Sequence, residues 1–271
     1  MTRPAAGPAL TWLYVPGDRP ERVTKALESG ADVVIVDLED AVAPEGKERA
    51  RAVVAELLSD RPPVPLHVRV NAPGSPWLAA DLAALAAAGG PTAVRLPKVT
   101  GPEQVAAVAE RSAGAGVYPL LESALGVEQA YAIARAHPAV RGLALGEADL
   151  RADLGVTAEE GLDWARSRVV VAARAAGLPA PVQSVYPDVR DLAGLAASCA
   201  RGRALGFLGR AAIHPRQLPV IAAAYLPTAS EITAAQAVLA ADGGGAVALP
   251  DGRMVDPAVV ALARRTLSPL P

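Results

Sequence analysis

Short apolar runs rich in valine, leucine and isoleucine alternate along the chain with longer segments of helical period, and this alternation repeats eight times. Such a repeat predicts successive strand–helix units whose strands lie parallel in one sheet. Eight units of this kind close into a (β/α)8 TIM barrel, an α/β fold. The expected strands are Trp12–Val15, Val33–Asp37, Leu66–Val70, Ala93–Pro97, Val117–Leu121, Gly142–Leu145, Val182–Val185 and Gly206–Ile213.

The length of 271 residues fits a single barrel, which we assign to residues 1–226 as the catalytic domain. An open doubly wound sheet is disfavoured because no G-x-G-x-x-G loop follows any expected strand. Residues 227–271 depart from the repeat: a hairpin turning at Asp251 and Gly252 is followed by a helix that opens after Asp256. We expect this C-terminal hairpin–helix extension to reach over the barrel mouth or onto a neighbouring subunit.

Composition excludes several classes of partner. The formal net charge is −2 and the pI about 6.0, so the chain lacks the basic footprint of a nucleic-acid-binding protein. The single cysteine, Cys199, excludes an internal disulfide and a cysteine-based metal site, which favours a reducing cytoplasm. No stretch approaches the roughly 20 apolar residues of a membrane span, and residues 1–10 lack a signal-peptide pattern. We expect a cytoplasmic protein without membrane or nucleic-acid partners.

Polar residues end the apolar runs of five consecutive expected strands. In a barrel the C-terminal strand ends face the active site, so these residues are the candidates for function. They are Asp37, Glu39 and Asp40 after the second strand, Arg69 and Asn71 after the third, Lys98 after the fourth, Glu122 after the fifth, and Glu147 and Asp149 after the sixth.

So many carboxylates at one barrel mouth would repel each other unless cations neutralise them. Arg69, Lys98 and a bound metal ion are the available cations. A set of oxygen ligands without histidine or cysteine favours a hard ion, Mg²⁺ with Mn²⁺ as the alternative. Glu122 and Asp149 suit Mg²⁺ best, because this ion commonly takes one or two protein carboxylates and completes its shell with water and substrate oxygens.

Each of these residues also has a structural interpretation. Asp40 and Asp149 fit helix caps, since acidic residues after strands often cap the next helix. Arg69 either points into the barrel or pairs with a structural carboxylate, and both interpretations need Glu39 or Asp40 nearby. His214 either fixes its loop or takes part in catalysis.

Ordered motifs along almost the whole chain resemble the citrate lyase β-subunit-like enzymes of the HpcH/HpaI aldolase superfamily. The motifs are LYVPGDRPERVTKAL, ADVVIVDLEDAV, RVNAPGSPWLAADL, LPKV, LLESALGV, GLALGEADLRADLG, LGFLGRAAIHPRQ and DGRMVDPAVV. The resemblance implies a barrel enzyme that makes or breaks a carbon–carbon bond in a 3-hydroxyacyl-CoA thioester, releasing acetyl-CoA and a 2-keto acid.

The resemblance also implies a role for each site residue. The metal ligands fall on Glu122 and Asp149 and the substrate-binding arginine on Arg69. The acidic pair falls on Glu39 and Asp40. Asp256 matches an acid/base on a lid that a neighbouring subunit contributes, and by its place before Pro257 it also fits the N-cap of the last helix. Arg19 and Lys98 match the basic residues that hold CoA. The chain departs from the family at Gln183, where many relatives are acidic, and at LTWLYVPG, where an Arg-Ser start is common.

We therefore expect an Mg²⁺-dependent lyase that acts on (3S)-citramalyl-CoA or malyl-CoA, assembled as a homotrimer or a dimer of trimers. Arg69 would stabilise the thioester enolate by a charge-assisted hydrogen bond. Three alternatives stay open: a citrate lyase β-subunit acting on a carrier-bound citryl thioester, a malyl-CoA thioesterase, and a CoA-binding partner protein without turnover.

Overall fold

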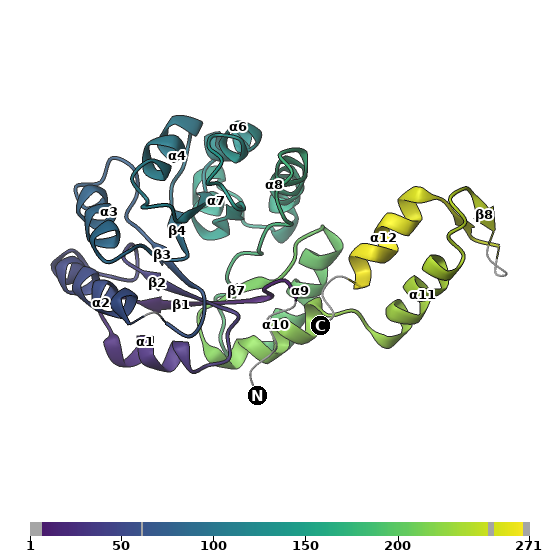
Figure 1. The fold of residues 1–271 in the computed structure, drawn as a ribbon, viewed down its shortest axis with the longest axis horizontal. Helices are drawn as coiled ribbons and strands as arrows, with labels where there is room; N and C mark the ends of the chain where they lie inside the picture. The colour runs from purple at the N-terminus through teal and green to yellow at the C-terminus, as the bar shows by residue number, and fades with distance from the viewer. Residues whose placement is uncertain (1–6, 61, 249–251, 268–271) are drawn as a thin grey trace.

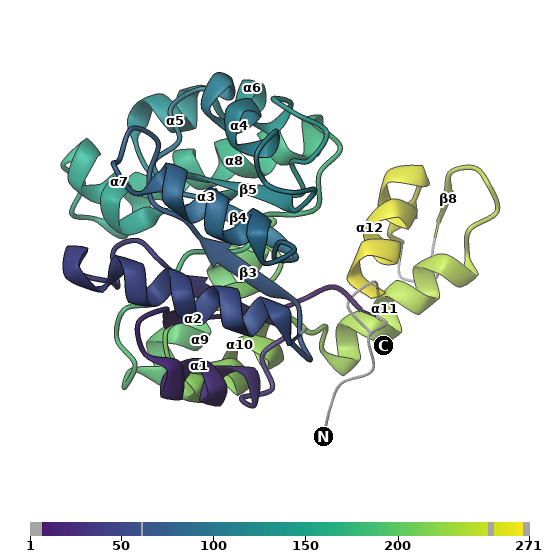
Figure 2. The same cartoon turned by 60° about the vertical axis from the view of Figure 1, so that its left-hand side comes forward.

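A single parallel sheet organises most of the chain. The computed structural model describes residues 7–60, 62–248 and 252–267. In these residues seven parallel strands pair in the order β6-β5-β4-β3-β2-β1-β7, and the sheet curls with helices around its outside (Figures 1 and 2). The strands are β1 (Thr11–Pro16), β2 (Val33–Asp37), β3 (Leu66–Arg69), β4 (Ala93–Leu96), β5 (Gly116–Leu121), β6 (Ala144–Leu145) and β7 (Arg210–Ala212).

A short segment joins the two edge strands of the sheet. Val182 pairs in parallel with Ala144 of β6, and Gln183 pairs in parallel with Arg210 of β7. The strand expected at Val182–Val185 is therefore reduced to two bridge residues. The backbone leaves the sheet after Gln183, and the next two residues line a pocket instead.

The last strand of the sheet is much shorter than the expected Gly206–Ile213. Gly206 and Gly209 have φ values of 98° and 79°, which an extended strand does not allow. A Cβ at Gly209 would lie 2.6 Å from the carbonyl oxygen of Leu10, so the close approach of the chain also requires glycine. Residues 206–209 therefore form a turn that leads into β7.

Helices cover the outer face of the sheet. α1 (Pro20–Leu27) shows the local reason: proline suits the first helical turn, and Val23 and Ala26 bury one face. The other α-helices are α2 (Lys47–Ser59), α3 (Leu78–Ala87), α4 (Pro102–Ala109), α5 (Ala124–Glu128), α6 (Ala130–Ala134), α7 (Glu147–Leu154), α8 (Asp163–Ala175), α9 (Leu192–Ala204), α10 (Leu218–Tyr225), α11 (Ala229–Ala240) and α12 (Pro257–Leu267). Short 3-10 helices are η1 (Pro44–Gly46), η2 (Glu159–Leu162) and η3 (Pro215–Gln217).

The apolar core has two layers because successive strand residues face opposite sides of the sheet. Along β2, Val34 and Val36 join the main cluster beneath the helices. The alternating residues Val33 and Ile35 point inward, where they pack with Trp12. The inside of the curled sheet is therefore filled by side chains below the pocket described next.

The chain after α10 forms a separate small unit. α11 and α12 pack together through their own cluster, which includes Val238, Val255 and Val260. The short strands β8 (Val247–Ala248) and β9 (Met254–Val255) pair antiparallel between them. The expected turn residue Asp251 lies outside the described residues. The unit stands to one side of the curled sheet and its helices in both ribbon views (Figures 1 and 2).

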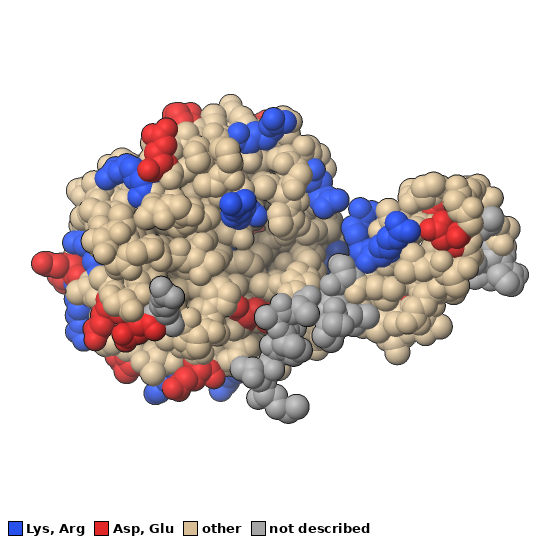
Figure 3. Space-filling view, in the orientation of Figure 1, with Lys and Arg blue, Asp and Glu red and all other residues tan. Residues whose placement is uncertain are grey.

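Surface charge and helix hydropathy add two observations. On the face shown in Figure 3, acidic and basic side chains are interspersed over the body of the molecule. Among the described residues, none of the helices has the length and apolar character that crossing a membrane requires.

Candidate functional site

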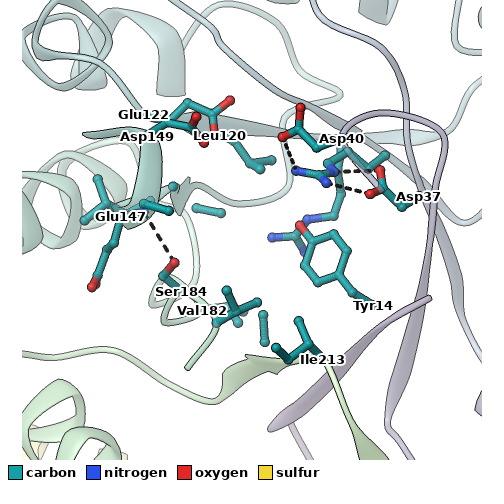
Figure 4. Close-up of a pocket in the computed structure, with 18 of the residues that line it drawn as sticks. Tyr14, Asp37, Asp40, Leu120, Glu122, Glu147, Asp149, Val182, Ser184 and Ile213 are labelled. Carbon is teal, nitrogen blue, oxygen red and sulfur yellow. Dashed lines mark hydrogen bonds and ion pairs between the residues drawn. The ribbon is translucent and has the colours of Figure 1, made fainter. Parts of the chain in front are cut away.

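A pocket of about 250 Å³ opens at the C-terminal ends of the strands. Every strand of the parallel sheet contributes to its lining. The labelled carboxylates lie on two sides of it, with Asp37 and Asp40 on one and Glu122, Glu147 and Asp149 on the other (Figure 4). The lining residues from the strands include Tyr14, Asp37, Arg69, Arg95, Leu120, Ala144, Leu145 and Ala211.

Arg69 forms the centre of the first side. Its Nε and Nη2 donate to the two oxygens of Asp37 at 2.7 and 2.6 Å, and its Nη1 lies 3.1 Å from Glu39 and 3.6 Å from Asp40. The paired carboxylates outweigh the burial of this guanidinium and hold the pKa of Arg69 above its usual value. The sequence expectation that Arg69 needs Glu39 or Asp40 nearby is confirmed, with Asp37 as the main partner.

The acidic pair is held by two cations. Burial raises the pKa of Glu39 above its usual range, and Arg69 and Lys98 only partly offset that effect. For the more exposed Asp40 burial also raises the pKa, but the ion pairs with Arg69 and Lys98 prevail and the pKa falls. Lys98 Nζ contacts Glu39 and lies 3.2 Å from Asp40. The pair therefore differs in basicity, with Glu39 the more readily protonated.

Lys98 also connects the two sides of the pocket. Its φ of 54° is uncommon for a residue with a Cβ, and its backbone N–H donates to Glu122 Oε1 at 2.5 Å. One residue thus contacts Glu39 with its side chain and Glu122 with its backbone. This placement differs from a free rim lysine, because the ammonium group is already engaged by two carboxylates.

Glu122 and Asp149 form the second side. Glu122 is 5% exposed, and burial raises its pKa to about 7 despite the Lys98 N–H, with the nearby Asp149 raising it further. Asp149 sits in the first turn of α7 and lines the same pocket. Two neighbouring carboxylates that raise each other's proton affinity are an oxygen donor set suited to a divalent ion.

The backbone leaves space for this donor set. A Cβ at Gly146 would lie 2.2 Å from Glu122 Oε2, so only glycine fits beside the carboxylate. Among the described residues no group of three or more acidic, histidine or cysteine side chains is arranged to hold a metal ion. A metal here would therefore have Glu122 and Asp149 as its protein ligands and take the remaining oxygens from elsewhere.

Two polar residues that end expected strands have structural partners. Arg166 binds both oxygens of Glu147, at 2.9 and 2.6 Å, in a buried ion pair. Asn71 bonds to Lys47 and Asp81. Their positions at strand ends were visible in the sequence, but these ion-pair and hydrogen-bond partners were not.

The helix-cap interpretation does not apply to Asp149 or Asp40. α7 has Gly146 at its N-cap position, and Asp149 makes no cap bond in that helix. Asp40 caps no helix either, since η1 follows Ala43 without a side-chain cap. Asp37 organises the loop instead, because its oxygens accept from the N–H groups of Glu39 and Ala41.

Three further candidates lie outside the pocket lining. Arg19 is exposed, precedes α1 and lies 3.7 Å from Asp18. Asp256 lies in the C-terminal unit, where its Oδ1 accepts from Val259 N at 2.9 Å and caps α12. His214 Nδ1 accepts from the N–H of Arg216, which matches the loop-fixing interpretation.

Sequence reasoning missed Arg95, Tyr14 and Lys47. Arg95 lies within an apolar strand rather than at its end, and the same signal that marked Arg69, a charge flanked by apolar residues, was present. Lys47 is buried and donates to the carbonyls of Leu38 and Glu39 at 2.7 and 2.8 Å. A lysine on the buried face of α2 was the available signal for this loop anchor.

Comparison with known proteins places this geometry in a family. The model of the HpcH/HpaI aldolase/citrate lyase family matches residues 10–215. The chain belongs to the HpcH/HpaI aldolase/citrate lyase family. A second model, described as a C-C bond lyase of the TIM-barrel fold, matches residues 169–267. The resemblance inferred from the motifs is thereby confirmed.

Relatives within the family span nearly the whole chain. A citrate lyase subunit beta-like protein of Mycobacterium tuberculosis is 40% identical and covers 98% of this chain and 97% of its own length. A (3S)-malyl-CoA thioesterase of Cereibacter sphaeroides is 36% identical, covering 97% and 95%. The structure of CitE from M. tuberculosis in complex with magnesium, acetoacetate and coenzyme A matches with a TM-score of 0.83, 38% identity and 97% coverage of both chains.

Proposed function

We propose that this protein is an Mg²⁺-dependent carbon–carbon lyase. It cleaves a 3-hydroxyacyl-CoA into acetyl-CoA and a 2-keto acid, or forms the 3-hydroxyacyl-CoA from these two compounds. The first substrates to test are (3S)-citramalyl-CoA and malyl-CoA. The observation that carries the proposal is the pairing of Glu122 with Asp149 in a pocket that also holds Arg69. The relative crystallised with magnesium and coenzyme A supports both the ion and the thioester.

We propose further that the curled sheet is a (β/α)8 barrel, in which Val182 and Gln183 form the eighth strand, between β6 and β7. In such a barrel the active site lies at the C-terminal mouth. The CoA portion would then lie outside at the rim, where exposed Arg19 is available to contact it. Lys98 keeps its assignment as a CoA contact only if the thioester displaces it from Glu39 and Asp40.

The chain's own residues would position the reacting atoms. Bound Mg²⁺ would act as a Lewis acid toward the hydroxyl and carboxylate of the substrate. Cleavage moves the hydroxyl proton to a carboxylate base and the electrons of the broken carbon–carbon bond to the thioester. The enolate formed there then takes up a proton to give acetyl-CoA. An enolate is an anion, so a fixed guanidinium beside it lowers the barrier.

Arg69 is suited to stabilise the enolate because most of its N–H groups already face carboxylates, which fix the orientation of the guanidinium. A guanidinium has five N–H groups. Asp37 takes one from Nε and one from Nη2, while Nη1 faces Glu39 and Asp40. The second N–H of Nη2 is left for a thioester oxygen. Because the pairing fixes the guanidinium before substrate binds, no side-chain ordering is needed at the moment of reaction.

The activity test is direct. Purified protein with MgCl₂ should release pyruvate and acetyl-CoA from citramalyl-CoA, or glyoxylate and acetyl-CoA from malyl-CoA, and EDTA should stop the release. Coupled dehydrogenase assays measure the keto acid and chromatography measures acetyl-CoA. If no 3-hydroxyacyl-CoA is cleaved and EDTA changes nothing, the proposal is wrong.

A malyl-CoA thioesterase is the second candidate, because a 36%-identical relative carries that name. A thioesterase yields malate and free CoA, whose thiol reacts with a thiol reagent, whereas a lyase yields acetyl-CoA, which does not. A third candidate is a citrate lyase β-subunit acting on a carrier-bound citryl thioester. That form would leave every free CoA ester intact.

Magnesium affinity should depend on pH through Glu122. The carboxylate must lose its proton to bind a metal, and its pKa in the metal-free protein is about 7. Below that pH the proton and the metal compete for the carboxylate. The dissociation constant for Mg²⁺ should therefore be about tenfold higher at pH 6 than at pH 8. Calorimetric titration at several pH values measures this. A constant affinity over the range would exclude Glu122 as a ligand.

Residues 227–271 are proposed as a lid that a neighbouring subunit of a homotrimer places over the pocket, with Asp256 as the acid/base. Asp256→Asn should keep the cap on α12, because asparagine also accepts from Val259 N, yet lower turnover by about 10²- to 10⁴-fold. Asp256→Ala should lose the cap as well. Turnover and melting temperature separate the two effects, and unchanged turnover in Asp256→Asn would move the base to Glu39 or Asp40.

A further inference from the structure

Arg95 is a buried cation within the same pocket as Glu122. It lies in the middle of β4 and is 2% exposed. Its guanidinium packs against three rings, at 5.4 Å from Trp12, 5.9 Å from Tyr14 and 5.7 Å from Tyr118. Contacts with aromatic faces stabilise a cation and hold its position without neutralising its charge.

No acidic group balances this charge in the described part of the chain. Arg95 Nε and Nη1 have no hydrogen-bond partner, and no carboxylate of the described residues lies within ion-pair distance of its guanidinium. Arginine stays protonated in proteins, so the charge persists despite burial. A buried charge without a partner is costly, which indicates that an anion is bound here during function.

The surroundings of Arg95 contain no group that could become its counter-ion. His67 packs against Trp12 and Tyr118 in the same interior cluster. Burial, assisted by the neighbouring Arg95, lowers the pKa of His67 to about 3, so the imidazole is neutral at physiological pH. Burial raises the pKa of the Tyr118 phenol above its usual value, so this group is neutral there as well. The missing negative charge must therefore come from a ligand.

Arg69, which also lines the pocket, differs from Arg95 in its carboxylate contacts and in its depth. It contacts three carboxylates, and its side chain is 14% exposed, so it lies nearer the mouth. Arg95 is deeper and has no carboxylate contact. A ligand entering from the mouth would meet Arg69 with its outer part and Arg95 with its innermost group.

We propose that Arg95 is a specificity-determining residue that binds the second carboxylate of a dicarboxylic 2-keto acid, such as oxaloacetate, at the floor of the pocket. This inference rests on the proposed lyase function. Within the 3-hydroxyacyl-CoA class it favours citryl-CoA over the citramalyl-CoA and malyl-CoA named above, because only citryl-CoA releases a dicarboxylic keto acid. The first carboxylate of the keto acid belongs beside Glu122 and Asp149. CoA is much too large for a cavity of about 250 Å³, so only the keto-acid end of the substrate reaches Arg95.

The competing interpretation is that Arg95 only supports the aromatic cluster. The two interpretations separate in the choice between substrates that differ by one carboxylate. Citryl-CoA releases oxaloacetate, whereas citramalyl-CoA releases pyruvate. A structural role would change kcat/KM for both in the same proportion, and a carboxylate contact would change only the first.

The variants are Arg95→Met, Arg95→Lys and a matched control. Methionine replaces the unpaired charge with an apolar chain of similar length, so the fold should persist. The control is Arg210→Met, since Arg210 is equally buried and without a carboxylate partner but is absent from the lining of this pocket. Melting temperature confirms folding of each variant.

The wild type should prefer citryl-CoA to citramalyl-CoA. Arg95→Met should lower kcat/KM for citryl-CoA by about 10- to 100-fold, as expected for a lost charge-assisted hydrogen bond, and leave citramalyl-CoA nearly unchanged. Arg95→Lys should recover part of the loss, and Arg210→Met should keep the wild-type ratio. In the presence of Mg²⁺, oxaloacetate should raise the melting temperature of the wild type more than pyruvate does. Arg95→Met should lose this difference, Arg95→Lys should recover part of it, and Arg210→Met should keep it.

Two results would overturn this inference without affecting the proposed lyase function. One is a wild type that prefers citramalyl-CoA. The other is an Arg95→Met variant with the wild-type ratio of kcat/KM for citryl-CoA to kcat/KM for citramalyl-CoA. If the wild type cleaves neither ester and neither keto acid shifts its melting temperature, the proposed function fails and the inference fails with it.

Discussion

Glu122→Gln should abolish magnesium binding and lower lyase turnover by at least about 10³-fold, because Lewis-acid stabilisation of the reacting oxygens contributes several kcal/mol. Glutamine keeps the size of the side chain and an oxygen that can accept from Lys98 N. It loses the charge that attracts a divalent cation. Magnesium titration by calorimetry and steady-state kinetics measure the two losses.

The folding stability of metal-free Glu122→Gln, unlike its activity, should not fall below that of the wild type. The pKa of Glu122 is higher in the folded chain than its ordinary value, so above pH 7 ionising this carboxylate opposes folding in the absence of metal. A neutral glutamine removes that penalty. The metal-free melting temperature at pH 8 should therefore hold or rise, while the increase caused by MgCl₂ disappears.

Glu128→Gln is the matched control, because Glu128 is an exposed glutamate on α5 just beyond the same strand. It should retain metal binding and turnover. If Glu122→Gln still binds Mg²⁺ and turns over, the metal site is elsewhere. If the wild type itself lacks turnover and binds CoA as well as Glu122→Gln does, the protein is a binding module.

The order of the strands was predictable because it rests on a periodicity that any parallel sheet must show. The shortened last strand was not, because the positive φ of Gly206 and Gly209 and the close approach of Gly209 to Leu10 arise from tertiary packing. A glycine in a sequence gives no sign of which φ region it will adopt. Strand lengths near the barrel rim therefore need the three-dimensional packing.

The candidate site followed from one rule, that polar residues at strand ends face the mouth. The rule placed Arg69, Glu122 and Asp149 in one pocket, as the structure finds. The rule also placed Glu147 at the pocket but gave no sign of its ion pair with Arg166 of α8, and it did not identify Arg95 within β4. A strand pattern indicates which face a side chain takes, but its partner from another helix depends on tertiary contacts. The roles assigned to the site residues stay predictions: Glu122 and Asp149 as metal ligands, Arg69, Glu39, Asp40 and Asp256 in catalysis, and Arg19 and Lys98 as CoA contacts.

Asp37→Asn should be among the most damaging single changes to both stability and activity. Asp37 is 1% exposed, and its two oxygens accept four hydrogen bonds, from Arg69 Nε and Nη2 and from the N–H groups of Glu39 and Ala41. Asparagine has one acceptor oxygen, so its NH₂ group must face another donor. Breaking one partner of a buried pair typically costs about 3–5 kcal/mol, because the remaining charge loses its compensation.

The activity loss should exceed what reduced folding explains. With Asp37 neutral, Arg69 has only Glu39 and Asp40 as partners, and both lie on the Nη1 side. The guanidinium should then turn toward them and misplace the donor meant for the thioester oxygen. A misplaced donor of this kind lowers kcat by about 10²- to 10³-fold. Kinetics corrected for the folded fraction, with urea unfolding for stability, measure both effects.

Asp163→Asn provides the comparison, because Asp163 also pairs with arginines but lies more exposed and outside the pocket lining. Exposed ion pairs contribute at most about 1 kcal/mol, so this variant should lose little stability and no activity. A double variant that combines Asp37→Asn with Arg69→Met should be less unstable than the sum of the single changes, since removing both partners leaves no unpaired charge. Additive losses would show that Asp37 acts through its loop contacts rather than through Arg69.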